Sequence, residues 1–152
     1  MYSLRTILNM YNHLEWANQR ILELLQSIEF ENEKAIRLFS HILLAEQVWF
    51  TRLKGEDSSQ ISIWSDIDVA ACAKIAKQNE ESYSLLLKEL TNSDLDLIIS
   101  YKNSKGKEFV TSVGDILTHI ALHGQYHRGQ INQLVRRNGI EPVNIDYITL
   151  VR

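Results

Sequence analysis

Apolar residues recur every three or four positions along the first part of the chain. Between residues 4 and 28 this spacing lays one stripe along a helix, formed by Leu4, Ile7, Tyr11, Leu14, Ile21, Leu25 and Ile28. Asn18 falls inside the stripe. A buried asparagine in a bundle seam is most often a hydrogen-bonded group that fixes helix register. We therefore expect Asn18 to be buried and bonded.

Three more segments have a helical pattern and residues typical of helix ends. Gly55 and Gly139 follow two of them, and glycine suits a left-handed C-terminal cap. Ser65 or Asp66 can cap the start of the third helix, and Ser112 with Asp115 resembles a capping box for the fourth. The expected bounds are about 33 to 54, about 65 to 90, and about 111 to 138.

Residues 95 to 110 depart from the helical pattern. LDLIISY is β-prone, NSKGK is typical of a turn, and EFVTS can return as a second strand. We expect a short β-hairpin or an extended crossover there, and an extended tail after Gly139. A single proline, Pro142, leaves long helices uninterrupted. The pattern predicts one all-α domain over residues 1–152, long enough to bury one core.

Composition excludes several classes of protein. The formal net charge is −3 with mixed signs, so no basic tract marks a nucleic-acid partner. Cys72 is the only cysteine, and no signal peptide or membrane-spanning apolar run is visible. We expect a soluble, cytoplasmic protein with neither nucleic acid nor a membrane as partner.

The stretch HGQYHRGQ contains two histidines, His123 and His127, four residues apart. On a helical wheel with His119 at zero, the apolar face centres at about 90°, with His123 at about 40° and His127 at about 80°. His41 falls on the apolar arc of its own helix. Three unpaired buried imidazoles would each cost about 1 to 3 kcal/mol, which one shared metal ion would relieve. Buried histidines bonded to carbonyls or carboxylates are the alternative.

Other polar residues are candidates for supporting such a site. Gln130 lies one turn from His127 on nearly the same face, and Asn18 would help if its stripe faces the metal. His119, at the edge of the stripe, is an alternate ligand or a supporting group. His13 lies on the polar side of the first helix and is expected at the surface.

Three residues are candidates for contact with a substrate. Arg128 could hold an anionic group, whereas Trp49 and Tyr126 could line a pocket or simply pack. Glu46 lies about 140° from His41 on the wheel, too far to ligate. We expect it to pair with Arg128 or Arg52.

Four segments carry a resemblance to a known family: YNHLEWANQRIL, HILLAEQVWFTRLKG, HIALHGQYHRGQINQLVRRNG and EPVNIDYI. They resemble the DinB/YfiT-like metal-binding four-helix-bundle proteins over nearly the whole chain. The H-x-x-x-H-R-G-Q element, together with His-x-x-x-Ala-Glu-x-x-Trp, is the more specific part. The resemblance implies an up-down-down-up bundle, homodimers, and one divalent ion bound by His41, His123 and His127.

The same resemblance suggests a chemistry. Related proteins include S-transferases and an isomerase that use low-molecular-weight thiols such as bacillithiol or mycothiol. The expected function is therefore a metal-dependent thiol S-transferase or hydrolase for a small molecule, in stress or detoxification, acting through a metal-bound water or thiol. Zinc or nickel is the expected metal, although three histidines also suit copper and iron. The alternative is a non-catalytic, metal-stabilised bundle that serves as a structural or stress-response interaction protein.

Overall fold

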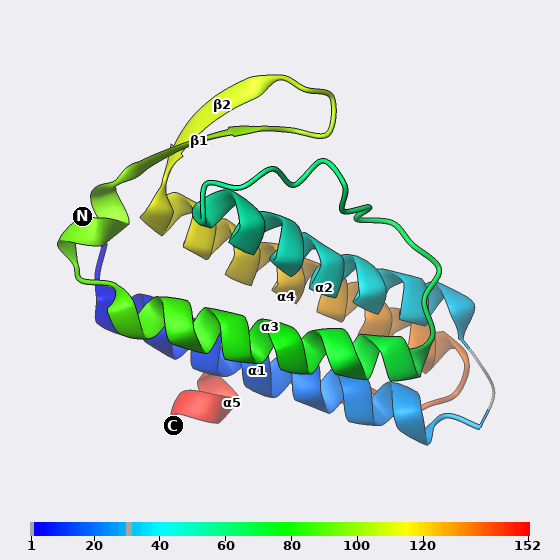
Figure 1. The fold of residues 1–152 in the computed structure, drawn as a ribbon. Helices are drawn as coiled ribbons and strands as arrows, with labels where there is room; N and C mark the ends of the chain where they lie inside the picture. The colour runs from blue at the N-terminus through cyan, green and yellow to red at the C-terminus, as the bar shows by residue number, and fades with distance from the viewer. Residues whose placement is uncertain (1, 30–31) are drawn as a thin grey trace.

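The protein is a bundle of four long helices (Figure 1). The computed structural model describes residues 2–29 and 32–152. The long helices are α1 (Leu4–Ser27), α2 (Glu33–Leu53), α3 (Val69–Glu89) and α4 (Val113–Arg137). Helices α1 and α4 run in one direction and α2 and α3 in the other, which confirms the up-down-down-up bundle. None of the helices in these two ranges is long and apolar enough to cross a membrane.

Side-chain caps set where the long helices begin. Each cap accepts a hydrogen bond from the backbone N–H three residues later, and the caps are Ser3, Asn32, Asp68 and Ser112. Gly55 and Gly139 both have φ 75°, as expected of residues that end α2 and α4. The predicted start of the third helix at Ser65 or Asp66 is wrong, because Asp68 is the residue that caps it. Residues 54 to 68 form a longer connection.

The segment between α3 and α4 contains a two-stranded hairpin. Strands β1 (Ile98–Lys102) and β2 (Glu108–Ser112) pair antiparallel, after a short 3-10 turn η1 (Ser93–Asp96). This confirms the predicted hairpin. The tail has no helix or strand from 140 to 146, but it differs from the expected extended tail in ending in a short helix, α5 (Tyr147–Val151), that packs on α1 (Figure 1).

A buried polar layer separates the two apolar halves of the core. One half contains Ala17, Ile21, Phe39 and Ile131, and the other contains residues such as Tyr11, Tyr83, Leu87, Ile116 and Leu117. Glu46 and Asn79 lie between these halves along their helices, Asn18 lies next to Ala17 at the edge of one half, and all three are buried. A layer of this kind fixes which residues of neighbouring helices face each other.

Four side chains of the layer form one chain of hydrogen bonds, one residue from each long helix. Arg128 Nη1 donates to Asn18 Oδ1 at 2.7 Å, and Asn18 Nδ2 donates to Glu46 Oε2 at 3.0 Å. Asn79 Nδ2 donates to Glu46 Oε1 at 3.0 Å. Gly124 makes room for this arrangement, because a Cβ there would lie 2.9 Å from Arg128 Nη1. We call this chain the four-helix polar bridge.

The ion pairs expected for Glu46 are not formed. Over residues 2–29 and 32–152 the only ion pair joins Arg37 and Asp66. The neutral Asn18 amide lies between Glu46 and Arg128 and bonds to both, which explains why the two charges do not meet directly. Arg52 instead lies over the ring of Trp49, 4.6 Å from its centroid. Burial raises the pKa of Glu46 and lowers the pKa of Arg128 to about 10.

Substitution of Asn18 by alanine tests the polar bridge. The change leaves Glu46 and Arg128 each short of a buried partner, and an unsatisfied buried polar group costs about 1 to 3 kcal/mol. We expect Asn18→Ala to lower the free energy of unfolding in urea by about 2 to 6 kcal/mol. The exposed neighbour Gln19→Ala should change it by less than about 0.5 kcal/mol. Equal stability of the two variants would contradict the role of the bridge.

Candidate metal centre

Three histidines converge between α2 and α4. One nitrogen of each of His41, His123 and His127 lies within 4.8 Å of the others. The shortest separation is 3.1 Å, between His41 Nε2 and His123 Nε2. Two nitrogens that bind one tetrahedral ion at about 2.0 to 2.1 Å lie about 3.4 Å apart. The 3.1 Å separation is close to this value, and the three histidines form a group that could hold a metal ion.

The connection between α2 and α3 fixes the orientation of His41. Its Nδ1 lies 2.8 Å from the carbonyl oxygen of Ile63, and its ring stacks on Trp64 with centroids 3.7 Å apart and planes 3° apart. A carbonyl only accepts, so Nδ1 carries the proton and Nε2 keeps its lone pair. That lone pair faces α4, as a metal ligand requires.

Gln130 fixes the orientation of His127 in the same way. Its Oε1 lies 2.6 Å from His127 Nδ1. Because an amide oxygen only accepts, Nδ1 is the donor and Nε2 is available to a metal. This is the contact expected for Gln130 from its position one turn away.

The surroundings favour neutral imidazoles. Burial lowers the pKa of His41 and lowers that of His123 to about 4, with smaller contributions to His123 from His127 and His41. A metal binds the neutral form of histidine, so these shifts remove competition from protons near pH 7. The orientation of His41 and His127 and the neutral form favoured for His41 and His123 therefore fit a divalent ion.

The chain is similar to known proteins over most of its length. The model of the DinB family matches residues 1–152. The chain belongs to the DinB family. Protein DinB of Bacillus subtilis (strain 168) is 25% identical over 155 residues, which covers 91% of this chain and 89% of that protein. A DinB-like protein from Bacillus cereus ATCC 10987, of known crystal structure, shares the fold with a TM-score of 0.65. It is 19% identical, over 91% of this chain and 94% of that one.

The helical wheel placed the buried face of α4 incorrectly. The buried positions of this DinB-family helix centre at about 140° from His119, not at about 90°. The difference arises because the predicted face counted Leu134, which is only half-buried, and left out Leu117 and Val135, which are buried at about 160°. His123 and His127 consequently lie at the edge of the buried face and are half-buried. An edge position gives a ligand access from solvent.

Arg128 and Asn18 lie away from the histidine cluster. Arg128 is fully buried, and its Nε donates to Gln125 Oε1 at 3.1 Å while its Nη1 donates to Asn18. A side chain with no exposed surface cannot reach a substrate, so the substrate contact expected of Arg128 is not supported. Asn18 bonds to Arg128 and Glu46, not to a histidine. Both residues belong to the polar bridge.

The remaining candidates border the cluster. The His119 ring lies 5.6 Å from that of His123 and 5.3 Å from that of Trp49, outside the three-histidine ligand group. Tyr126 is 66% exposed, with its ring 5.1 Å from that of His127. Trp49 packs against His119 and Arg52, whereas Tyr126 is open to a ligand.

One prediction outside the cluster is wrong, and two residues that contact His41 were not predicted. His13, expected at the surface, is buried because the tail covers that face of α1, with His13 Nε2 2.7 Å from the carbonyl oxygen of Ile145. The helical pattern of α1 alone could not show this cover. Ile63 and Trp64 were not recognised from the sequence; the only signal is the apolar run ISIW in a largely polar connection.

Metal content tests the three-histidine assignment. We expect purified wild type to contain close to one divalent ion per chain, measured by elemental analysis, and His123→Ala to lose it. His119→Ala should keep the ion, because His119 lies outside the ligand group. Loss of metal from both variants, or from neither, would contradict the assignment.

The contact between Gln130 and His127 predicts a second effect. Partners that orient a metal-binding histidine typically contribute 10- to 100-fold to metal affinity. Gln130→Leu should therefore weaken affinity by about 10- to 100-fold in a competition titration with a chelator. The exposed Gln133→Leu, on the same helix, is the matched control and should bind as wild type does. Equal affinity of the two variants would rule out an orienting role.

The lowered pKa of His123 predicts a pH effect on metal-free protein. In the unfolded chain His123 takes up a proton near its ordinary pKa of 6.5, whereas in the folded protein it stays neutral to about 4. The unfolded state therefore binds more protons between these values, and stability falls as pH falls. Urea unfolding from pH 7 to pH 5 should show a smaller decrease for His123→Gln than for wild type. An unchanged slope would contradict the burial of a neutral imidazole.

Proposed function

We propose that this DinB-family protein is a metal-dependent enzyme in which His41, His123 and His127 hold one zinc or nickel ion. The observation that carries the proposal is the number of ligands. Within the described part of the chain, the three histidines form a group that no cysteine, carboxylate or fourth histidine joins. Structural zinc sites are closed by four protein ligands, whereas catalytic sites keep a position open.

The proposed reaction is thiol S-transfer or hydrolysis on a small molecule. A divalent ion in such a site lowers the pKa of a bound water or thiol towards neutrality. Trp64 and Ile63 cover the His41 side, and the exposed Tyr126 stands beside His127. A substrate would therefore approach along α4, with Tyr126 as one wall. An electrophilic substrate and a low-molecular-weight thiol would meet beside Tyr126.

The likeness to the DinB family supports a proposal for the wider setting. We propose a role in stress or detoxification, in the cytoplasm, with a homodimer as the working form. The thiol would be a small cytoplasmic one of the bacillithiol or mycothiol type. Nucleic acid is not among the proposed partners, because the charge of −3 is spread over both signs.

A second candidate function has an observation in its favour. His41 is only 5% exposed and is held by the stacked Trp64, so the site also ties α2 to α4 and to their neighbouring connection. The metal could then act as a staple in a non-catalytic bundle. This alternative requires a coordination sphere closed to thiols and to substrates.

An activity screen separates the two functions. Metal-loaded wild type would be assayed with small thiols paired with electrophiles, and with hydrolysable esters and amides. We expect turnover that falls at least about 100-fold in His127→Ala, with helix content by circular dichroism unchanged. Gln133→Ala on the same helix should retain full turnover. Turnover equal in wild type and His127→Ala, or a metal-loaded site that binds no thiol and turns over nothing, would favour the structural alternative.

A further inference from the structure

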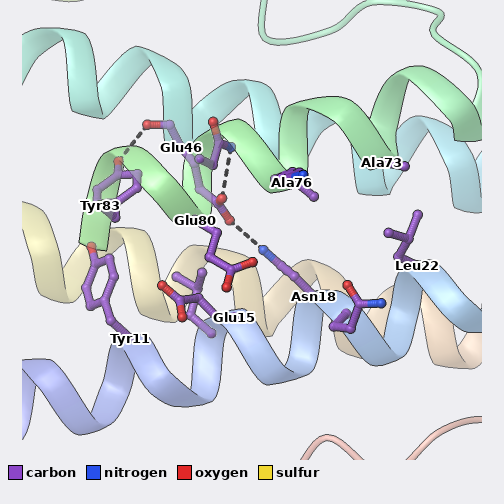
Figure 2. Close-up of a pocket in the computed structure, with 13 residues that line it drawn as sticks. Tyr11, Glu15, Asn18, Leu22, Glu46, Ala73, Ala76, Glu80 and Tyr83 are labelled. Atoms are coloured by element: carbon purple, nitrogen blue, oxygen red, sulfur yellow. Dashed lines mark hydrogen bonds between the residues drawn. The ribbon is translucent and has the colours of Figure 1, made fainter. Parts of the chain in front are cut away.

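A cavity lies between α1 and α3, lined by none of the three histidines of the candidate metal centre. Its volume is about 310 Å³. Small-molecule sites usually measure about 300 to 1,000 Å³, and one water occupies about 30 Å³. The cavity is therefore large enough for a small organic molecule. The wall includes Asn18 and Glu46 of the polar bridge (Figure 2).

Three carboxyl groups face this cavity. Glu15 of α1 and Glu80 of α3 extend towards one another across it, and Glu46 of α2 forms part of its wall (Figure 2). Lys77 is the only cationic side chain in the lining, and it is exposed. The lining thus has an excess of negative charge.

Glu46 is a buried carboxyl group without a direct cationic partner, since the Asn18 amide lies between it and Arg128. It is 3% exposed, and each of its oxygens accepts a single hydrogen bond from an amide, Asn18 or Asn79. No Lys, Arg or His nitrogen lies within 4.0 Å of it in the described ranges. A carboxylate can accept about four hydrogen bonds, and a buried charge is stable only when it is paired. Acceptor capacity therefore remains on a buried group that lines the cavity.

Glu15 shows that the cavity favours a positive charge. Burial, together with the neighbouring charges of Glu80 and Glu46, raises the pKa of Glu15 to about 7. A cation placed among the three carboxyl groups would reverse the unfavourable repulsion between them. The geometry of the cavity, with carboxyl groups on three helices, gives such a cation several partners at once.

The rest of the wall suits an organic body more than a bare metal ion. Leu14, Leu22, Ala73 and Ala76 contribute apolar surface. Tyr11 and Tyr83 add two aromatic rings, 5.4 Å apart. A hydrated inorganic ion gains nothing from such a surface, whereas an alkyl chain is stabilised by leaving water.

We propose that this cavity binds a small organic ammonium ion, with its charge against Glu15, Glu46 and Glu80 and its apolar body between α1 and α3. The inference does not depend on the function proposed for the histidine site. The two sites are separate, but the polar bridge joins them, since Glu46 lies on the helix of His41 and Arg128 follows His127.

Calorimetric titration with butylammonium chloride at pH 7.5 tests the proposal. We expect saturable binding to wild type that weakens at least 10-fold in Glu15→Gln and in Glu80→Gln. Glu81→Gln, with the same charge change on an exposed residue of α3 outside the cavity lining, should bind as wild type does. His123→Ala should also bind normally, which separates this site from the metal centre. Neutral 1-butanol should bind at least 10-fold more weakly.

Other results would overturn the proposal. Absence of saturable butylammonium binding to wild type would do so directly. Equal weakening in Glu15→Gln and Glu81→Gln would indicate general surface attraction. Equal binding of 1-butanol would indicate an apolar cavity, and binding of magnesium chloride alone, lost in Glu15→Gln, would indicate an inorganic cation site. Glu80 is exposed, so Glu80→Gln keeps the test valid if Glu15→Gln does not fold.

Discussion

The hydrogen bonds from Arg128 through Asn18 and Glu46 to Asn79 join all four long helices in the middle of the bundle. Apolar packing alone permits helices to rotate or slide with little change in buried area, whereas a chain of directional bonds fixes both. Because each member is buried, a shifted helix would leave a charged or polar group without a partner. The relative positions of the side chains on the four helices depend on this constraint.

The polar bridge also places the metal ligands. Arg128 is about 100° around α4 from His127, so fixing Arg128 in the core holds His127 at the edge that faces α2. Glu46 is about 140° around α2 from His41 and has the same effect on that helix. The three histidines therefore meet between α2 and α4 as a consequence of bonds made deeper in the bundle. The carbonyl of Ile63 and the amide of Gln130 then set which ring nitrogen faces the metal.

Much of the fold was predictable because its signals are local. Periodicity and caps give the helices, and NSKGK between two β-prone runs gives the hairpin. The failures come from contacts between distant segments. His13 is buried by a tail more than 130 residues later, with a bond to Ile145. The start of α3 depended on which of several polar residues acts as its cap, a choice that the sequence pattern does not decide.

The candidate site was predictable to the same degree. The i, i+4 spacing of His123 and His127 is a local signal, and the apolar arc around His41 supplied the third member. The role of Arg128 was not predictable, because a charged residue that replaces an apolar one in the core looks like a surface residue in a hydrophobic pattern. Trp64 lies in an irregular connection, where no periodicity indicates which way a side chain points.

The most direct test of the account is a crystal structure of the metal-loaded protein, with the metal identified by anomalous scattering. We expect one ion bound by the Nε2 atoms of His41, His123 and His127 at about 2.0 to 2.1 Å, with a further position open to water. The Nδ1 atoms of His41 and His127 should stay bonded to Ile63 and Gln130. Coordination through either Nδ1 atom, or a fourth protein ligand that closes the site, would contradict it.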